Sequence, residues 1–128
     1  MYDHIGLKVG DLKASVRFYE AALAPLGHEL CANDADYAGL GSGGEATLWL
    51  YAARSQASPG VHVAFCTTTR AAVDRFHELG LGAGGRDQGA PGVRADYYGP
   101  AYYAAFLLDP DGNNVEAVCV PAFQGSGD

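Results

Sequence analysis

An internal repeat limits the possible folds of this chain more than any other feature. Residues 4–9 (HIGLKV) are similar to residues 62–67 (HVAFCT), and the two segments begin 58 positions apart. The same offset aligns residues 17–20 (RFYE) with residues 75–78 (RFHE). Several matches at one fixed spacing predict two structural halves of the same architecture. We expect a single domain over residues 1–124, with halves at about 1–57 and 58–124, and a disordered tail at 125–128.

The first half has the pattern of a strand, a helix and three further strands. Alternation predicts a strand over residues 2–9, and Asp11 is a suitable N-cap for a helix that continues to Leu23. Pro25 and Gly27 end that helix. Short strands are predicted near 28–32, 36–41 and 46–53.

The second half follows the same order after a predicted linker at residues 58–60 (SPG). It opens with a strand over 61–67, and Thr68 or Thr69 caps a helix that reaches about Leu79. Residues 89–100 are predicted to form a long loop. A hairpin follows, with strands at 101–108 and 114–120 around the turn at 109–113 (DPDGN), in which proline fixes φ and glycine supplies a positive φ.

Composition narrows the function classes. Fifteen acidic and eight basic residues give a formal charge of −7, which disfavours nucleic acid and anionic membranes as partners and favours a cationic or neutral ligand. No apolar stretch is long enough for a membrane span, and the N-terminal residues do not form a signal peptide, so we expect a cytoplasmic protein. Cys31, Cys66 and Cys119 are widely spaced and are interpreted as core or strand residues.

Three segments together resemble the vicinal oxygen chelate superfamily, which includes glyoxalase I, bleomycin-resistance proteins, fosfomycin-resistance enzymes and extradiol dioxygenases. They are residues 4–26 (HIGLKVGDLKASVRFYEAALAPL), 62–65 (HVAF) and 106–118 (FLLDPDGNNVEAV). The resemblance extends over about residues 2–120. It implies an α+β fold of two tandem βαβββ modules, whose curved mixed sheets surround a shared cavity.

The resemblance also implies a metal site, because ligands in this superfamily lie on the first and last strand of each module. Carried over to this sequence, they are His4, His62 and Glu116. The fourth ligand would lie in residues 47–51 (TLWLY), where alignment with Val115 to Ala117 places Trp49. Two imidazoles and one carboxylate suit one divalent ion, namely Fe, Mn, Ni or Zn.

Further residues are candidates for contact with a substrate. They are Trp49, Arg94, Tyr102 and Tyr103. Tyr102 and Tyr103 point to opposite faces of a strand, so at most one of them faces a given cavity.

Two functions remain open. The first is a metal-dependent lyase, isomerase or dioxygenase acting on a small oxygenated metabolite, in which Glu116 assists proton transfer. Trp49 disfavours the glutathione-dependent isomerase, and Phe106 stands where extradiol dioxygenases carry tyrosine. The alternative is a metal-free protein that binds or sequesters a drug, as bleomycin-resistance proteins do, which fits the charge of −7 and Trp49. In either case the superfamily resemblance implies a homodimer.

Overall fold

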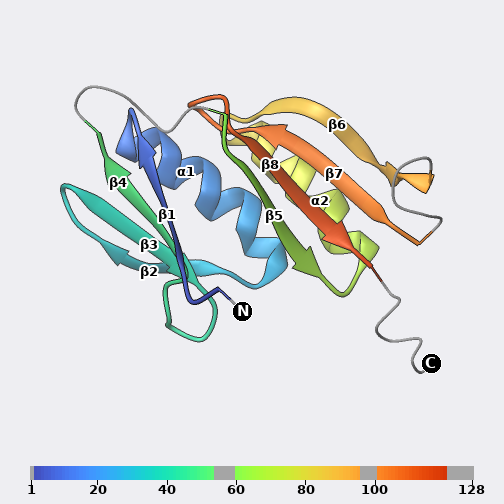
Figure 1. Cartoon of the computed structure of the whole chain (residues 1–128), viewed down its shortest axis with the longest axis horizontal. Coiled ribbons are helices and arrows are strands. Elements are labelled where there is room, and N and C mark those ends of the chain that lie inside the picture. The colour runs from blue at the N-terminus through green and yellow to red at the C-terminus, as the bar shows by residue number, and fades with distance from the viewer. Residues whose placement is uncertain (1, 54–59, 96–100, 121–128) are drawn as a thin grey trace.

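The computed structural model describes residues 2–53, 60–95 and 101–120, so most of the predicted linker and the predicted tail lie outside the described residues. The first half forms a sheet with strand order β1-β4-β3-β2 (Figure 1). Its elements are β1 (Ile5–Val9), α1 (Leu12–Leu23), the 3₁₀ turn η1 (Ala24–Leu26), β2 (Glu29–Asn33), β3 (Tyr37–Gly41) and β4 (Leu48–Ala52).

The second half repeats this topology in a second sheet with strand order β5-β8-β7-β6. Its elements are β5 (His62–Thr67), α2 (Arg70–Gly82), β6 (Arg86–Val93), β7 (Tyr103–Leu108) and β8 (Asn114–Cys119). In each sheet the first strand pairs in parallel with the last, and the other pairs are antiparallel. The predicted pair of βαβββ modules is therefore confirmed.

Both helices begin at the predicted caps. The Asp11 carboxylate accepts a hydrogen bond from the backbone N of Ala14 at 3.1 Å, and the Thr69 hydroxyl accepts one from Ala72 N at 3.2 Å. Each cap satisfies a backbone donor that has no partner within the helix. The second helix continues to Gly82, three residues beyond the predicted end at Leu79.

The prediction of a loop over residues 89–100 is wrong for residues 89–93, which belong to β6. The segment GAPG carries glycine and proline, which are typical of loops. Here these residues are tolerated because β6 lies at the edge of the sheet beside β7, and its pairing with β7 is irregular between Asp87 and Gly92.

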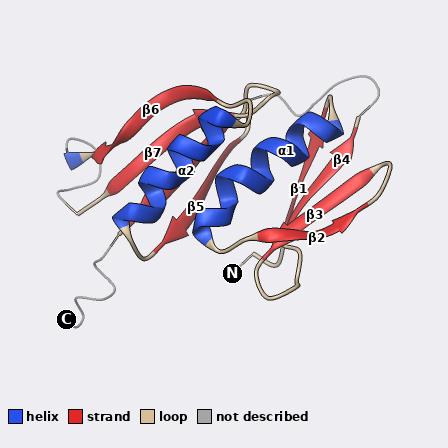
Figure 2. Ribbon diagram, turned by 180° about the vertical axis from the view of Figure 1, so that it is seen from behind, coloured by secondary structure: helices blue, strands red, loops and turns tan. Residues whose placement is uncertain are grey.

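One face of each sheet packs against its own helix. Leu7 and Leu50 of the first sheet are buried against α1, and Val115 and Leu107 of the second sheet belong to the same core as Phe76 of α2. The two halves meet mainly through α1 against α2, with η1 also contacting α2 and β5 (Figure 2). We call the opposite side of each sheet, away from the helices, its open face.

A buried hydrogen-bond network anchors the DPDGN turn of the second half to the first half. The Tyr19 hydroxyl of α1 donates to Asp109 Oδ2 at 2.5 Å, and Asp109 also accepts from the side chain and backbone N of Asn113. Asn113 in turn accepts from the backbone N of Val61, the residue before β5. The turn therefore fixes where β5 lies relative to β8.

In the described part of the chain, neither helix has the length and apolar character needed to cross a membrane.

Candidate functional site

A hydrogen-bonded cluster of His62, Glu116 and Tyr102 lies on the open face of the second sheet. His62 Nε2 is 3.0 Å from Glu116 Oε1, and the Tyr102 hydroxyl donates to Glu116 Oε2 at 2.5 Å. His62 opens β5, Glu116 lies on β8, and Tyr102 comes directly before β7. The sequence therefore brings together three side chains from three neighbouring strands.

Strand register explains this convergence. β5 pairs with β8 so that His62 is opposite Asn114 and Ala64 is opposite Glu116. Because side chains two residues apart lie on the same face of a strand, His62 and Glu116 are diagonal neighbours. On β7, Phe106 is opposite Glu116, which places Tyr102 on this face as well.

The carboxylate is buried while the imidazole is accessible. The side chain of Glu116 is 4% exposed, and that of His62 is 49% exposed. An unpaired carboxylate would be costly at this depth, so His62 and Tyr102 stabilise Glu116 there. The accessible imidazole leaves a route by which a ligand can reach the pair.

The predicted third ligand, His4, does not join this cluster within one chain. Its Nδ1 lies 2.7 Å from Asp3 Oδ1, and its side chain is 56% exposed. Strands β1 and β5 run in opposite directions in Figure 1, so the ends at which His4 and His62 lie are far apart. Accordingly, the described residues of a single chain contain no group of three or more His, Cys, Asp or Glu side chains that could hold a metal.

Trp49 occupies the position in the first half that matches Glu116 in the second. Ile5 is opposite Leu48 in the first sheet, and the residue that matches Ile5 in the repeat, Val63, is opposite Val115 in the second. The next residues along β4 and β8 are therefore Trp49 and Glu116. The alignment made from the sequence agrees with this register.

Aromatic side chains surround Trp49 on the open face of the first sheet. Trp49, Tyr37 and Tyr51 line a recess of about 250 Å³, and the rings of Trp49 and Tyr37 meet edge to face at 6.0 Å. A Cβ on Gly39 would lie 2.7 Å from the Trp49 ring, and one on Gly6 would lie 2.9 Å from the Tyr51 ring. The two glycines thus let both rings lie close to the sheet.

The remaining predicted contact residues separate onto two faces. Tyr103 faces α2, where its hydroxyl donates to Asp74 at 2.6 Å and its ring lies 4.8 Å from the Arg70 guanidinium carbon. The bond to Asp74 raises the pKa of Tyr103. We therefore leave Tyr103 out of the candidate site. Arg94 lies over the ring of Phe106 at 5.4 Å, on the same side as Glu116.

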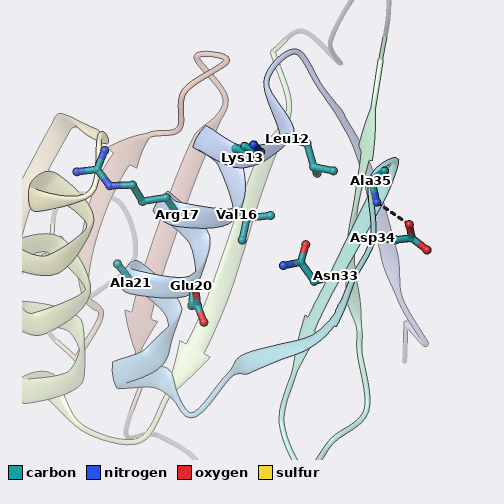
Figure 3. A pocket seen from close by; sticks show the side chains of 9 residues that line it. All are labelled: Leu12, Lys13, Val16, Arg17, Glu20, Ala21, Asn33, Asp34 and Ala35. Carbon is teal, nitrogen blue, oxygen red and sulfur yellow. Dashed lines mark hydrogen bonds between the residues drawn. The ribbon is translucent and has the colours of Figure 1, made fainter.

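A larger cavity of about 490 Å³ lies elsewhere, between α1 and the turn that joins β2 to β3 (Figure 3). Val16, Asn33 and Glu20 point into it, while Arg17 extends toward α2 and donates to Gly82 O at 3.4 Å. Its lining is mostly exposed, and it contains none of the clustered residues of the second sheet. We do not assign it a function.

Two contributions to the open faces were missed in the sequence. Tyr102 was predicted as a substrate contact, but not as the hydrogen-bond donor to Glu116. Tyr37 and Tyr51 were not singled out, although they are opposite each other in the register of β3 and β4. For Tyr51 the available signal was alternation along β4, where Leu48 and Leu50 are buried and Trp49 and Tyr51 are not. β3 offers no such signal, because every residue after Tyr37 in that strand is buried.

Comparisons with known proteins agree with this architecture. A crystal structure of a glyoxalase/bleomycin resistance protein from Albidiferax ferrireducens T118 is 28% identical, with a TM-score of 0.79 over 93% of this chain and 98% of that one. A crystal structure of a glyoxalase/bleomycin resistance protein/dioxygenase family enzyme from Burkholderia phytofirmans PsJN has the same fold. It is 22% identical, with a TM-score of 0.71 over 92% of this chain and 97% of that one. No curated protein matches significantly.

A glyoxalase I mutant from Zea mays is also similar, with 28% identity and a TM-score of 0.72. The match covers 95% of this chain but only 47% of the maize chain. The sequence model of the Glyoxalase/Bleomycin resistance protein/Dioxygenase superfamily matches residues 2–117. The chain therefore belongs to this superfamily.

Proposed function

We propose that the protein is a divalent-metal-dependent enzyme of the glyoxalase/dioxygenase type, acting on a small oxygenated metabolite as a lyase, isomerase or dioxygenase. The observation that carries this proposal is the buried Glu116 carboxylate with an accessible imidazole 3.0 Å away. Nitrogen and oxygen ligands about 2.0–2.2 Å from one ion lie roughly 3.0–3.4 Å from each other, for octahedral to tetrahedral angles, so the spacing of these two atoms is close to that of two ligands of one cation.

Two protein donors are fewer than a stable site requires, since catalytic metal sites typically have three. We propose that His4 of a second copy supplies the third donor, because His4 and His62 do not come together within one chain. The homodimer predicted from the superfamily resemblance would then be a condition for metal binding. Fe, Mn, Ni and Zn all suit imidazole and carboxylate donors.

Each side chain has a role in this proposal. A bound ion would supply Lewis acidity toward adjacent substrate oxygens. Glu116 would help to hold it and could receive a proton from the substrate. Tyr102, whose hydroxyl is 2.5 Å from Glu116 Oε2, would orient the carboxylate and could pass the proton onward.

Elemental analysis of protein purified without chelator tests the proposal, beside His4→Ala, His62→Ala and Glu116→Gln. We expect about one equivalent of metal per chain in the parent and loss of metal in all three variants. His77→Gln is a matched control, because His77 also contacts a carboxylate, Asp87 at 2.8 Å, but takes no part in the cluster. A parent that takes up no metal after reconstitution with each of the four ions would contradict the proposal.

A second candidate is a metal-free binding protein for flat, cationic drugs. It is favoured by the aromatic recess around Trp49, by the absence of a carboxylate at that position, and by the net charge of −7. Stacking and cation–π contacts on Trp49 would hold such a ligand. Titration with acridinium should then quench the fluorescence of Trp49 in chelator-treated protein, and unchanged emission would argue against this candidate.

A further inference from the structure

Four residues form one row across the open face of the second sheet. From β5 to β6 the register aligns Ala64, Glu116, Phe106 and Gly89. Adjacent strands are about 4.8 Å apart, so β8 and β6 are separated by roughly 10 Å, with Phe106 between them. The ring of Phe106 also lies 6.3 Å from that of His62. A ligand that extends from the His62–Glu116 pair along this row must therefore pass over Phe106.

Arg94 lies at the far end of the row. Its Nη1 donates to Gly92 O at 2.9 Å and its Nη2 donates to Ala90 O at 2.7 Å. A Cβ added to Gly89 or Gly92 would come within 3.2 Å of the guanidinium. The two glycines therefore give the guanidinium room to lie against β6, where both hydrogen bonds hold it over Phe106.

The guanidinium of Arg94 has further N–H groups besides the two that hold it against β6. Two of its five N–H groups donate to backbone carbonyls, and no side chain in the described ranges accepts a hydrogen bond from the other three. Among the residues that the structure describes, no acidic side chain forms an ion pair with Arg94. A planar guanidinium held in this way suits bidentate binding of a carboxylate.

We propose that Arg94 binds the carboxylate of a small planar acid, whose opposite end carries adjacent oxygens that reach His62 and Glu116. This inference rests on the proposed function, because it places the reacting end of the substrate at that pair. The apolar middle of the substrate would lie on Phe106. Arg94 would thus select an anionic substrate, although the net charge of the protein is negative.

Two probes with the same chelating end separate the role of Arg94 from that of the metal. They are 1,2-dihydroxybenzene, which is neutral, and 3,4-dihydroxybenzoate, which adds one carboxylate. Calorimetric titration of the metal-loaded parent should show roughly tenfold tighter binding of the acid. In Arg94→Gln this preference should fall to about twofold or less, with the affinity for the neutral probe unchanged.

Two further variants guard against loss of structure. Arg94→Lys keeps the charge without the planar fork and should retain part of the preference. Arg86→Gln removes an arginine from the other end of β6 and should keep the full preference. A preference that persists in Arg94→Gln, or no binding of the acid by the parent up to about 5 mM, would overturn the inference.

Repeating the titrations after chelator treatment distinguishes this inference from the proposed function. If the acid still binds, and its advantage still requires Arg94, the anion site stands and the metal-dependent function fails. If both probes require metal but the acid has no advantage, the metal site stands and the role of Arg94 is refuted.

Discussion

Replacing Tyr19 by phenylalanine tests how the two halves are held together. Tyr19 is fully buried on α1, and its hydroxyl donates to Asp109, which lies 90 positions later in the DPDGN turn. Phenylalanine keeps the ring and its packing against Phe18 but removes the hydroxyl. The substitution therefore isolates one hydrogen bond between the two halves.

The expected cost follows from the surroundings of Asp109. Its fully buried carboxylate accepts four hydrogen bonds, from Tyr19, from the side chain and backbone of Asn113, and from the backbone of Asp111. A hydrogen bond to a charged group is worth about 1.5–3 kcal/mol, and the three bonds that remain limit the penalty. We expect Tyr19→Phe to lower the free energy of unfolding by about 2 kcal/mol, which corresponds to roughly 6–10 °C in Tm.

The loss of stability caused by Tyr19→Phe should become smaller above pH 10. Burial, followed by the charge of Asp109, raises the pKa of Tyr19 well above its ordinary value of 10.0. Above pH 10 the unfolded chain ionises this tyrosine while the folded chain keeps it neutral, so its contribution to stability is present below pH 10 and declines above it. The decline approaches about 1.4 kcal/mol per pH unit for one group, and Tyr19→Phe lacks it.

Urea denaturation followed by circular dichroism, at pH 7 and in steps to pH 11, measures both the cost of Tyr19→Phe and its dependence on pH. Tyr37→Phe is the control, because Tyr37 is 39% exposed on the open face and its change should stay within about 0.5 kcal/mol. The reasoning is refuted if Tyr19→Phe costs less than about 0.5 kcal/mol at pH 7. It also fails if the difference between the parent and Tyr19→Phe stays constant above pH 10.

Substitution of glycines gives two further predictions. Gly80→Ala should destabilise the protein by about 1–2 kcal/mol despite the better helix propensity of alanine, because the new Cβ would clash with Cδ1 of the buried Leu107. Gly82→Ala in the same helix has open space and should stabilise the protein by about 0.4–1 kcal/mol. If urea denaturation shows that both substitutions change the free energy of unfolding in the same direction, this explanation is contradicted. Gly39→Ala should displace the ring of Trp49, and because Trp49 is the sole tryptophan, a shift in its emission maximum should report the displacement. An unchanged emission spectrum would show that the ring does not depend on this glycine.

The order of elements was accessible from the sequence because each signal was local. Alternating residues indicated the first strand, and Asp11 and either Thr68 or Thr69 indicated the helix starts, of which the structure has Asp11 and Thr69. The strand β6 was missed because an edge strand tolerates the glycine and proline that otherwise indicate a loop. The hydrogen bond between Tyr19 and Asp109 was not predicted, since it depends on how α1 packs against the turn.

The candidate site was only partly accessible for a related reason. The repeat predicts that His4 and His62 occupy matching places in their modules, but it does not predict how the modules are oriented. The superfamily resemblance named His62 and Glu116, and their contact requires only the pairing of two strands within one sheet. Whether His4 meets them depends on which faces oppose each other, and in one chain the halves meet through their helices.

The two open faces have diverged at matching positions. Where the second sheet has Ala64 opposite Glu116, the first has Gly6 opposite Trp49. A Cβ on Gly6 would lie 2.9 Å from the Tyr51 ring, so Gly6 gives that ring room to lie against the first sheet. One module thus presents a carboxylate with an imidazole, and the other presents a wall of aromatic rings. A cavity built from one face of each kind would hold a polar group at one side and a flat apolar surface at the other. This asymmetry is consistent with the planar acid that we propose as a ligand of Arg94, whose adjacent oxygens would lie at the polar side.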